Sequence, residues 1–356
     1  MDNGFVFKDF FKIKSGKVQW RSPSNIALIK YWGKKTGQIP INPSLSFSLT
    51  KCFTTTTITF KKNKSSFPKY HFLFHGQKTP SFESKIDNFF NKILKYCPYI
   101  LDIEMQIESY NSFPHSSGIA SSASSFSALS LCIMEIERTL NPQIDDSYFF
   151  KKASFISRLG SGSACRSVFE KFSIWGESSI ISGSNDLYAL PYNKKIHNSF
   201  NYLCDTILIV DKSKKEFSST KGHKLMNGHF YVDGRMAQVE SNFSKLIESL
   251  QSGNYDMFIK TVEQEALALH AMMMTSDPYF ILMKSSTLEI IKALWQFRRT
   301  SGSKLCFTLD AGANVHIIYP RKEFNNVQNF ISEKLLSYCQ NGEFINDTIG
   351  TGPLKL

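Results

Sequence analysis

The sequence predicts an α+β chain of two layered domains. Segments with strand patterns and segments with helical patterns follow one another in mixed order, without the strict alternation of a doubly wound sheet. A length of 356 residues suffices for two domains, and 42% hydrophobic residues allow a sizeable core. A loop-rich stretch, residues 185–202, divides the chain near residue 200. The expected domains are therefore residues 1–200 and 201–356.

Residue patterns then predict the individual elements. In the first half, β-branched and aromatic residues predict two strands within 45–60 and further strands at 69–74, 101–110 and 172–175. Apolar residues at helical spacing predict helices at 82–94, 119–137 and 146–159, the last ended by Gly160. In the second half, the same patterns predict strands at 206–210, 305–309 and 315–319, and helices at 242–250, 255–274, 279–298 and 324–338.

Composition limits the classes of function. The net charge of +12, carried by scattered basic pairs, fits nucleic-acid binding, steering of an anionic substrate or an ordinary solvated surface. No aromatic residues are interleaved with a basic stretch, so we expect no nucleic-acid partner. The seven cysteines have no CxxC spacing and the histidines no ligand spacing, which predicts a cytoplasmic protein with reduced thiols and no metal site. There is no apolar run of about 18 residues and no secretory signal, so we expect no membrane partner.

The first segment that could carry chemistry is PHSSGIASSA, residues 114–123. A strand, a glycine–serine turn and a helix follow one another here. The free N–H groups and the positive end of the helix dipole make such a turn an anion site, and Gly118 lets a phosphate approach the backbone. The alternative is a helix with a serine-rich first turn and no ligand. The segment lacks the pattern GxxxxGK[ST], so it is not a P-loop of that type.

Two further segments carry one charged side chain each. In GSGSACRS, residues 160–167, Arg166 follows a cluster of glycines and serines and can hold a carboxylate or phosphate through two parallel bonds. In LDAGAN, residues 309–314, Asp310 ends a strand that we expect to be buried, where a neighbouring cation would keep it ionised and able to act as a base. The alternatives are a flexible turn with a surface arginine and an aspartate that caps its own turn.

The remaining two segments are rich in lysines and hydroxyls. Lys30 follows an apolar run in SPSNIALIKYWGK, residues 22–34, so its ammonium would be partly buried and would need an anion. A strand end with exposed lysines is the alternative. SSTKG, residues 218–222, reads as a hydroxyl-rich turn, for which an ordinary polar loop is the favoured interpretation.

Together these segments resemble the diphosphomevalonate decarboxylase family, a branch of the kinases named after galactokinase, homoserine kinase, mevalonate kinase and phosphomevalonate kinase. The resemblance rests on NIALIKYWGKK with INPSLSFSL after it, FPHSSGIASSAS, GSGSACRS, SSTKG and LDAGAN, in this order over residues 20–340. It implies a ribosomal-protein-S5-like N-terminal α/β domain and a ferredoxin-like C-terminal α+β domain with a cleft between them. It also implies a homodimer.

The resemblance assigns roles to particular residues. The family's catalytic centre falls on Lys30, Arg166 and Asp310. Its substrate-binding positions fall on Tyr31, Trp32, Gly33, Lys34, Ser161, Gly162, Ser163, Ala164, Cys165, Arg166, Ser219 and Thr220. Its ATP phosphate loop falls on Ser116, Ser117, Gly118, Ala120, Ser121 and Ser122.

This sequence also departs from the family pattern. The family usually has proline where Ala313 stands, and often an Ala-Ala pair in place of Ser116-Ser117. Near Lys69 it often has an arginine that binds the substrate diphosphate. If Lys69 takes that place, two-pronged binding of the diphosphate is weaker.

The implied reaction is ATP-dependent decarboxylation of a phosphorylated small molecule, (R)-5-diphosphomevalonate, to isopentenyl diphosphate, with Mg²⁺ accompanying ATP. Asp310 would accept or orient the substrate hydroxyl proton, Arg166 would bind the substrate carboxylate, and Lys30 would offset negative charge. A decarboxylase of the monophosphate, a related kinase that stops after phosphorylation, and a basic nucleic-acid-binding protein are the alternatives.

Overall fold

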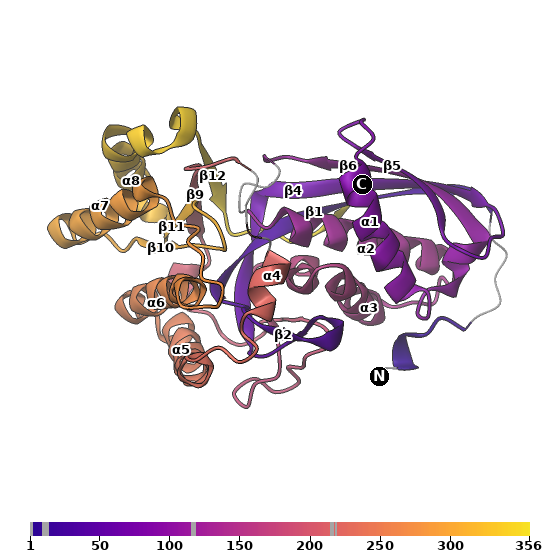
Figure 1. The fold of residues 1–356 in the computed structure, drawn as a ribbon, viewed down its shortest axis with the longest axis horizontal. Helices are drawn as coiled ribbons and strands as arrows, with labels where there is room; N and C mark the ends of the chain where they lie inside the picture. Colours follow the sequence, from indigo (N-terminus) through magenta and orange to yellow (C-terminus); the bar gives the residue numbers. More distant parts are fainter. Residues whose placement is uncertain (1–2, 9–13, 115–118, 214–216, 218) are drawn as a thin grey trace.

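The structure, a computed structural model, describes residues 3–8, 14–114, 119–213, 217 and 219–356. Its strands form two main sheets, one from each half of the chain (Figure 1). The first sheet has the order β13-β1-β4-β6-β5, with β7 and β8 attached beside β4. Its strands are β1 (Gly16–Ile29), β4 (Ser44–Lys62), β5 (Lys69–Phe74), β6 (Ile103–Asn111), β7 (Phe172–Trp175), β8 (Leu190–Pro191) and β13 (Leu354–Lys355). A separate hairpin joins β2 (Lys34–Lys35) to β3 (Ile39–Pro40).

Three helices cover one face of the first sheet. They are α1 (Pro80–Ile93), α2 (Ser121–Leu140) and α3 (Asp146–Gly160), and Figure 1 shows them grouped along that sheet. α2 packs directly on β1 and β4, and α3 packs on α2. α2 is buried on most sides, and its fully buried positions are small or apolar, as in Ser127, Ala128 and Leu131.

The second sheet has the order β10-β11-β9-β12. Its strands are β9 (Leu203–Leu208), β10 (Cys306–Thr308), β11 (Val315–Pro320) and β12 (Phe344–Thr348). The helices of this half are α4 (Ser219–Lys224), α5 (Val232–Ser252), α6 (Tyr255–Met274), α7 (Ser285–Ser301) and α8 (Phe324–Phe330). One face of the sheet, with Phe307 and Ile317, shares a core with α7 and α8. The other face, with Ile207 and Ile318, shares a core with β1, β4, α5 and α6.

The two sheets are joined through a common core and through one buried carboxylate. Ile26 of β1 and Phe47 of β4 belong to the same hydrophobic cluster as Ile207 and Ile318 of the second sheet. Asp347 of β12 is 2% exposed and accepts the backbone N–H groups at positions 50, 51 and 52 of β4 at 2.7–2.8 Å. The chain then returns to the first sheet, where β13 pairs with β1. The junction is therefore fixed by apolar contact and by charged hydrogen bonds together.

The α+β two-domain class is confirmed, and so are most of the expected elements. The helix at 255–274 and the strand at 69–74 have the expected limits, and we place the domain boundary near residue 200, between β8 and β9. The expected break within 45–60 is wrong, because β4 continues through Lys51 while β1 pairs with both of its halves. The segment 218–222 was expected to be a turn, but residues 219–224 form helix α4.

Three expected helices also differ from the structure. The helix expected at 242–250 begins already at Val232. The helix expected at 279–298 begins only at Ser285, since residues 279–284, after Pro278, follow a non-helical path. The one expected at 324–338 is α-helical only to Phe330 and then changes to π and 3-10 turns. Strands β1, β12 and β13 were not anticipated as strands. Among the described residues, no helix is both long and apolar enough to cross a bilayer.

The Asp347 contacts lead to a stability prediction. Replacing Asp347 by Asn puts an NH₂ group opposite backbone donors that are buried, and an unsatisfied buried donor costs about 1–3 kcal/mol. We expect Asp347→Asn to lower the free energy of unfolding by about 2 kcal/mol in urea denaturation. The control is Asp256→Asn, which breaks an exposed pair with Lys304 and should cost less than about 1 kcal/mol. Equal losses would mean that the junction does not depend on Asp347.

Candidate active site

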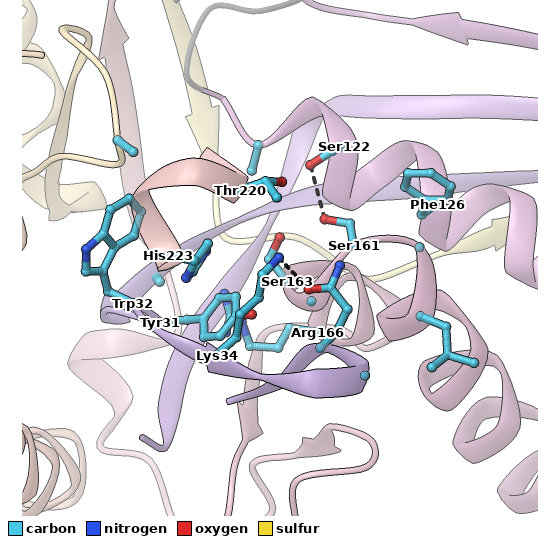
Figure 2. Close-up of a pocket in the computed structure, with 18 of the residues that line it drawn as sticks. Tyr31, Trp32, Lys34, Ser122, Phe126, Ser161, Ser163, Arg166, Thr220 and His223 are labelled. Atoms are coloured by element: carbon cyan, nitrogen blue, oxygen red, sulfur yellow. Dashed lines mark hydrogen bonds between the residues drawn. The ribbon is translucent and has the colours of Figure 1, made fainter. Parts of the chain in front are cut away.

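A cavity of about 1230 Å³ opens between the two halves of the chain. Its walls come from the end of β1, from α1, from the start of α2, from the 3-10 turn Gly162–Val168, from α4, and from Asp310. Figure 2 shows Tyr31, Lys34, Ser163 and Arg166 gathered on one side, with Thr220 and His223 of α4 facing them. The predicted cleft between the domains thus coincides with this cavity.

Lys30 and Asp310 form an ion pair across the domain junction. The Lys30 Nζ lies 3.1 Å from Asp310 Oδ1, although the two residues are 280 positions apart. Lys30 is 1% exposed because it continues the buried end of β1, while 26% of the Asp310 side chain remains accessible. The expectation of a buried lysine that needs an anion is therefore confirmed, and the exposed-lysine alternative is wrong.

Buried hydrogen bonds fix the backbone of Lys30 on both sides. Its N–H donates to Glu265 Oε2 of α6 at 2.9 Å, and its carbonyl oxygen accepts from Asn42 Nδ2 at 3.0 Å. Glu265, which is 0% exposed, also accepts two bonds from the Arg235 guanidinium, at 2.7 and 2.6 Å, and one from Asn242 Nδ2 at 2.8 Å. Four hydrogen bonds, one from Lys30 after β1 and three from α5, thus converge on this buried carboxylate and stabilise its charge.

The charges around the Lys30 ammonium act on its pKa in opposite directions. Burial lowers the pKa of Lys30, whereas Asp310 and then Glu265 raise it, and Arg166 lowers it further. The net shift is downward, so Lys30 gives up its proton more readily than a lysine in water. Its protonated form depends on the two carboxylates beside it.

Arg166 also lines the cavity, but the hydrogen-bond partners of its guanidinium are neutral groups. It is 2% exposed, and its guanidinium donates to the Ser44 hydroxyl and, at 3.4 Å, to Asn25 Oδ1. It also lies 5.9 Å from the centre of the Trp175 ring. Burial lowers the pKa of Arg166, while Cys165 and Asp310 raise it. The resemblance groups Lys30, Arg166 and Asp310 in one centre, and direct contact confirms this for Lys30 and Asp310. Arg166 lines the same cavity, and its approach to Asp310 stays a prediction.

The turn after β1 brings two ligand-binding candidates to the cavity. Lys34 is half-buried and its ammonium donates to Gln38 Oε1 at 2.7 Å. The Tyr31 hydroxyl is buried against Gly162 and has no hydrogen-bond partner among the described residues. A buried hydroxyl without a partner is costly unless a water or ligand supplies one. Tyr31 and Lys34 therefore offer a donor pair to an anion.

The start of α2 forms another part of the wall. Ala120 has a left-handed backbone, with φ of 48°, and is followed by Ser121 and Ser122, which open the helix. All three line the cavity, and the hydroxyls of Ser122 and Ser161 lie 3.2 Å apart. The first turn of α2 thus lies at the cavity, the position expected for an anion site at a helix start. Ser116, Ser117 and Gly118 lie outside the described residues.

Most of the expected substrate-binding residues meet at this cavity. Those on its wall are Tyr31, Trp32, Lys34, Ser161, Gly162, Ser163, Arg166 and Thr220. In the described part of the chain, Gly33, Ala164 and Cys165 are not on the wall, and the side chain of Ser219 lies outside what the structure describes. Gly33 instead permits the turn, since its φ is 92° and an added Cβ would collide with Ile41. Ala164 and Cys165 are fully buried behind Arg166.

The cavity wall is strongly basic. Seven cations, Lys30, Lys34, Lys35, Lys85, Lys92, Arg166 and Lys224, share it with a single carboxylate, Asp310, among the described residues. Such a cavity concentrates anions and supports a ligand with several negative charges. No group of three or more His, Cys, Asp and Glu suited to a metal ion occurs in the described ranges.

The sequence comparisons agree with this geometry. Residues 22–189 match the model of the diphosphomevalonate decarboxylase-like N-terminal domain, and residues 206–350 match that of the mevalonate 5-diphosphate decarboxylase C-terminal domain. The chain belongs to the diphosphomevalonate decarboxylase family. The Ganoderma lucidum diphosphomevalonate decarboxylase is 28% identical, over 92% of this chain and 84% of that protein, and the Saccharomyces cerevisiae one is 25% identical over 87% and 79%.

Solved structures of the diphosphomevalonate decarboxylase family share the fold. The Staphylococcus aureus mevalonate diphosphate decarboxylase superposes with a TM-score of 0.81, at 27% identity, over 96% of this chain and 98% of that one. A structure described as MDDEF in complex with MVAPP, AMPPCP and magnesium gives a TM-score of 0.80, at 27% identity and the same coverage. The S5-like and ferredoxin-like architecture implied by the resemblance is in keeping with these matches.

Several cavity residues of this family member were missed from the sequence. Lys85 and Lys92 lie seven positions apart on α1, which places them on one helix face, and that spacing was a usable signal. His223 of α4 was not singled out because its segment reads as a loop. Glu265 and Arg235 have no local signal, since each is an ordinary charged residue within a helical pattern. Lys69, by contrast, begins β5 opposite Glu104 and is not among the described wall residues.

The contacts of Glu265 predict a change in pH dependence. Glu265→Gln removes a negative charge that raises the Lys30 pKa, so Lys30 should lose its proton at lower pH. We expect the alkaline limb of kcat/KM to move to lower pH. The control is Glu263→Gln on the same helix, which breaks a pair with Arg298 and should leave that limb in place. An unmoved limb in the Glu265 variant would separate Glu265 from the charge state of Lys30.

Proposed function

We propose that this chain catalyses the ATP-dependent decarboxylation of (R)-5-diphosphomevalonate to isopentenyl diphosphate, with release of ADP, phosphate and CO₂. It would thus act as a carboxy-lyase. The observation that carries the proposal is the Lys30–Asp310 pair, set in a cavity with seven cations and one carboxylate, in a member of this family. We also propose that it works in the cytoplasm as a homodimer, where its seven buried, unpaired cysteines stay reduced.

The substrate chemistry explains why ATP is needed. The substrate is a β-hydroxy acid whose hydroxyl sits on a tertiary carbon, and hydroxide is a poor leaving group. Transfer of the γ-phosphoryl group turns this hydroxyl into a phosphate ester. The C–O bond then breaks with departure of phosphate, the C–C bond to the carboxylate breaks with loss of CO₂, and its electron pair forms the new C=C bond.

Asp310 and Lys30 act on the hydroxyl. The accessible side of the Asp310 carboxylate faces the cavity and takes the hydroxyl proton as the O–P bond forms. The Lys30 ammonium, 3.1 Å away, keeps Asp310 ionised beforehand and offsets charge on the transferring phosphoryl group. Because Lys30 is fixed at its backbone by Glu265 and Asn42, this geometry needs no rearrangement.

Arg166 binds the substrate carboxylate. Its partners Ser44 and Asn25 are neutral, so its full positive charge stays available to an anion in the cavity. A guanidinium fixed in this way holds the carboxylate in line with the departing phosphate. When CO₂ forms, the carboxylate loses its charge, which releases it from Arg166.

The phosphate groups have two places to bind. Tyr31, Lys34 and the Ser161–Ser163 stretch form one donor group for the substrate tail, and the start of α2, with Ser121 and Ser122, forms the other for ATP. Since Lys69 is not on the described cavity wall, the substrate tail depends on the first group. Mg²⁺ would accompany ATP, because it binds proteins mainly together with phosphate oxygens and water, and the hydroxyls of Ser121 and Ser122 would offer it further oxygen ligands. Bound there, the ion neutralises phosphate charge.

The direct test is an assay of ATP-dependent CO₂ release with 5-phosphomevalonate and 5-diphosphomevalonate side by side. CO₂ release with the diphosphate supports the proposal. CO₂ release only with the monophosphate would change the substrate, and ADP formation without CO₂ would identify a kinase that stops after phosphorylation.

The role of Asp310 predicts a loss of turnover without a loss of binding. Asp310→Asn keeps the shape of the side chain and removes the proton acceptor, so kcat should fall by at least about 10²–10⁴-fold. Dissociation constants for ATP and substrate, measured by calorimetry, should stay within about threefold, because neither phosphate group is assigned to Asp310. Near-normal kcat in the purified variant would remove Asp310 from the reaction.

The role of Arg166 predicts a difference between two substitutions. Arg166→Lys keeps a charge and loses the planar fork, so turnover should fall while ATP affinity changes little. Arg166→Gln should be worse, and its residual activity should rise toward higher pH, because an Asp310 that has lost a nearby cation holds its proton more tightly. pH–rate profiles at saturating ATP measure both effects. A Gln variant that equals the Lys variant, with an unshifted acidic limb, would assign Arg166 a purely structural role.

A further inference from the structure

We propose that His223 is a positioning residue that sets the Tyr31–Lys34 turn for the phosphorylated tail of the substrate. The inference rests on the proposed function and adds to it a residue outside the expected site. His223 belongs to α4 in the second half of the chain, whereas the turn follows β1 in the first half. The residue therefore connects the two walls of the cavity at the place where the tail binds.

The contacts of His223 are made to the backbone and the rings of the turn. Its Nδ1 accepts the N–H of Gly33 at 2.9 Å. The imidazole lies between two aromatic rings, with centroids 4.4 Å from Tyr31 and 4.6 Å from Trp32 (Figure 2). The preceding residue, Gly222, comes so close to Trp32 that a Cβ there would lie 2.5 Å from the indole. Helix α4 thus packs against three consecutive residues of the turn, Tyr31, Trp32 and Gly33.

The hydrogen bond requires a neutral imidazole with its proton on Nε2. Nδ1 can accept the Gly33 N–H only if it carries no proton. Burial, followed by the charge of Lys34, lowers the pKa of His223 to about 3, so the ring stays neutral at any working pH. Lys34, the charge that acts on the ring, and Lys224, the next residue of α4, are both cations, and they oppose a positive charge on His223.

The Gly33 N–H has a particular need for this acceptor. Gly33 has a φ of 92°, a conformation reserved for glycine, and Ile41 and Met226 close over its Cα. Without His223, the N–H would be buried with no acceptor, and the turn would relax to find one. Such relaxation would move the side chains on either side, Tyr31 and Lys34, which carry the donors for the substrate tail.

Three substitutions of His223 test separately the hydrogen-bond acceptor, the flat ring and the position of the polar atoms. His223→Asn keeps an oxygen near the place of Nδ1, His223→Phe keeps a flat ring with no acceptor, and His223→Gln carries its polar atoms near the place of Nε2 instead. The matched control is His75→Phe, because His75 Nε2 also accepts a backbone N–H, that of Asn111, but lies outside the cavity wall.

We expect His223→Phe to raise KM for the phosphorylated substrate at least about tenfold, as for a lost buried hydrogen bond, while kcat and KM for ATP change less than about threefold. His223→Asn should recover most of the lost affinity and His223→Gln should not. The control should keep the wild-type KM. If His223 had a purely structural role, all three variants would be less thermally stable, and KM would not change separately from kcat. That result, or an Asn variant no better than Phe, would overturn the proposal.

Calorimetry with inorganic diphosphate makes the test independent of turnover. Wild type and the Asn variant should bind diphosphate more tightly than the Phe variant, by the same ratio as in KM. If the wild type releases no CO₂ but this order of affinities holds, the proposed function fails and the positioning role stands. If the wild type is active and all variants bind diphosphate equally, the positioning role fails alone.

Discussion

The carboxylate of Glu265 is the interaction on which the active cavity depends. It is fully buried, and it receives the Lys30 N–H, two bonds from Arg235 and one from Asn242. A buried charge is tolerated only with such complete partners, so the position of β1 relative to α5 and α6 has little freedom. Groups from both halves of the chain therefore meet at this carboxylate, which lies directly behind Lys30.

From this point a row of charges of alternating sign leads into the cavity: Arg235, Glu265, Lys30 and Asp310. Each of these charges lies next to one of opposite sign, which offsets part of the cost of burying it. The remaining cations of the cavity, such as Lys34 and the Lys85 and Lys92 side chains of α1, lie outside this row of charges. They make the cavity electropositive and are available to bind an anionic ligand.

Local sequence was enough to find the reacting groups but not the groups that hold them. Lys30 ends an apolar strand and Asp310 ends a buried one, and each stands out within ten residues of sequence. Glu265 and Arg235 pair across 30 positions of two helices, and no pattern within either helix distinguishes them from solvent-facing charges. For the same reason the pairing of β13 with β1, between the two ends of the chain, was not predictable. Helix α4 was mistaken for a turn because its stability comes from packing on Trp32 rather than from its own sequence.

The distance between Lys30 and Asp310 is set by the junction of two sheets, since one residue comes from each half. Three separate devices hold that junction: the Glu265 cluster, the Asp347 carboxylate under β4, and the return of β13 to β1. The groups proposed to bind the substrate tail lie instead on short elements, the Tyr31–Lys34 turn and helix α4. In the proposed reaction, the packed sheets would therefore hold the Lys30–Asp310 pair for proton transfer, and the shorter elements would decide which tail is accepted. A change in substrate preference would therefore arise from the turns, and a change in the chemistry from the junction.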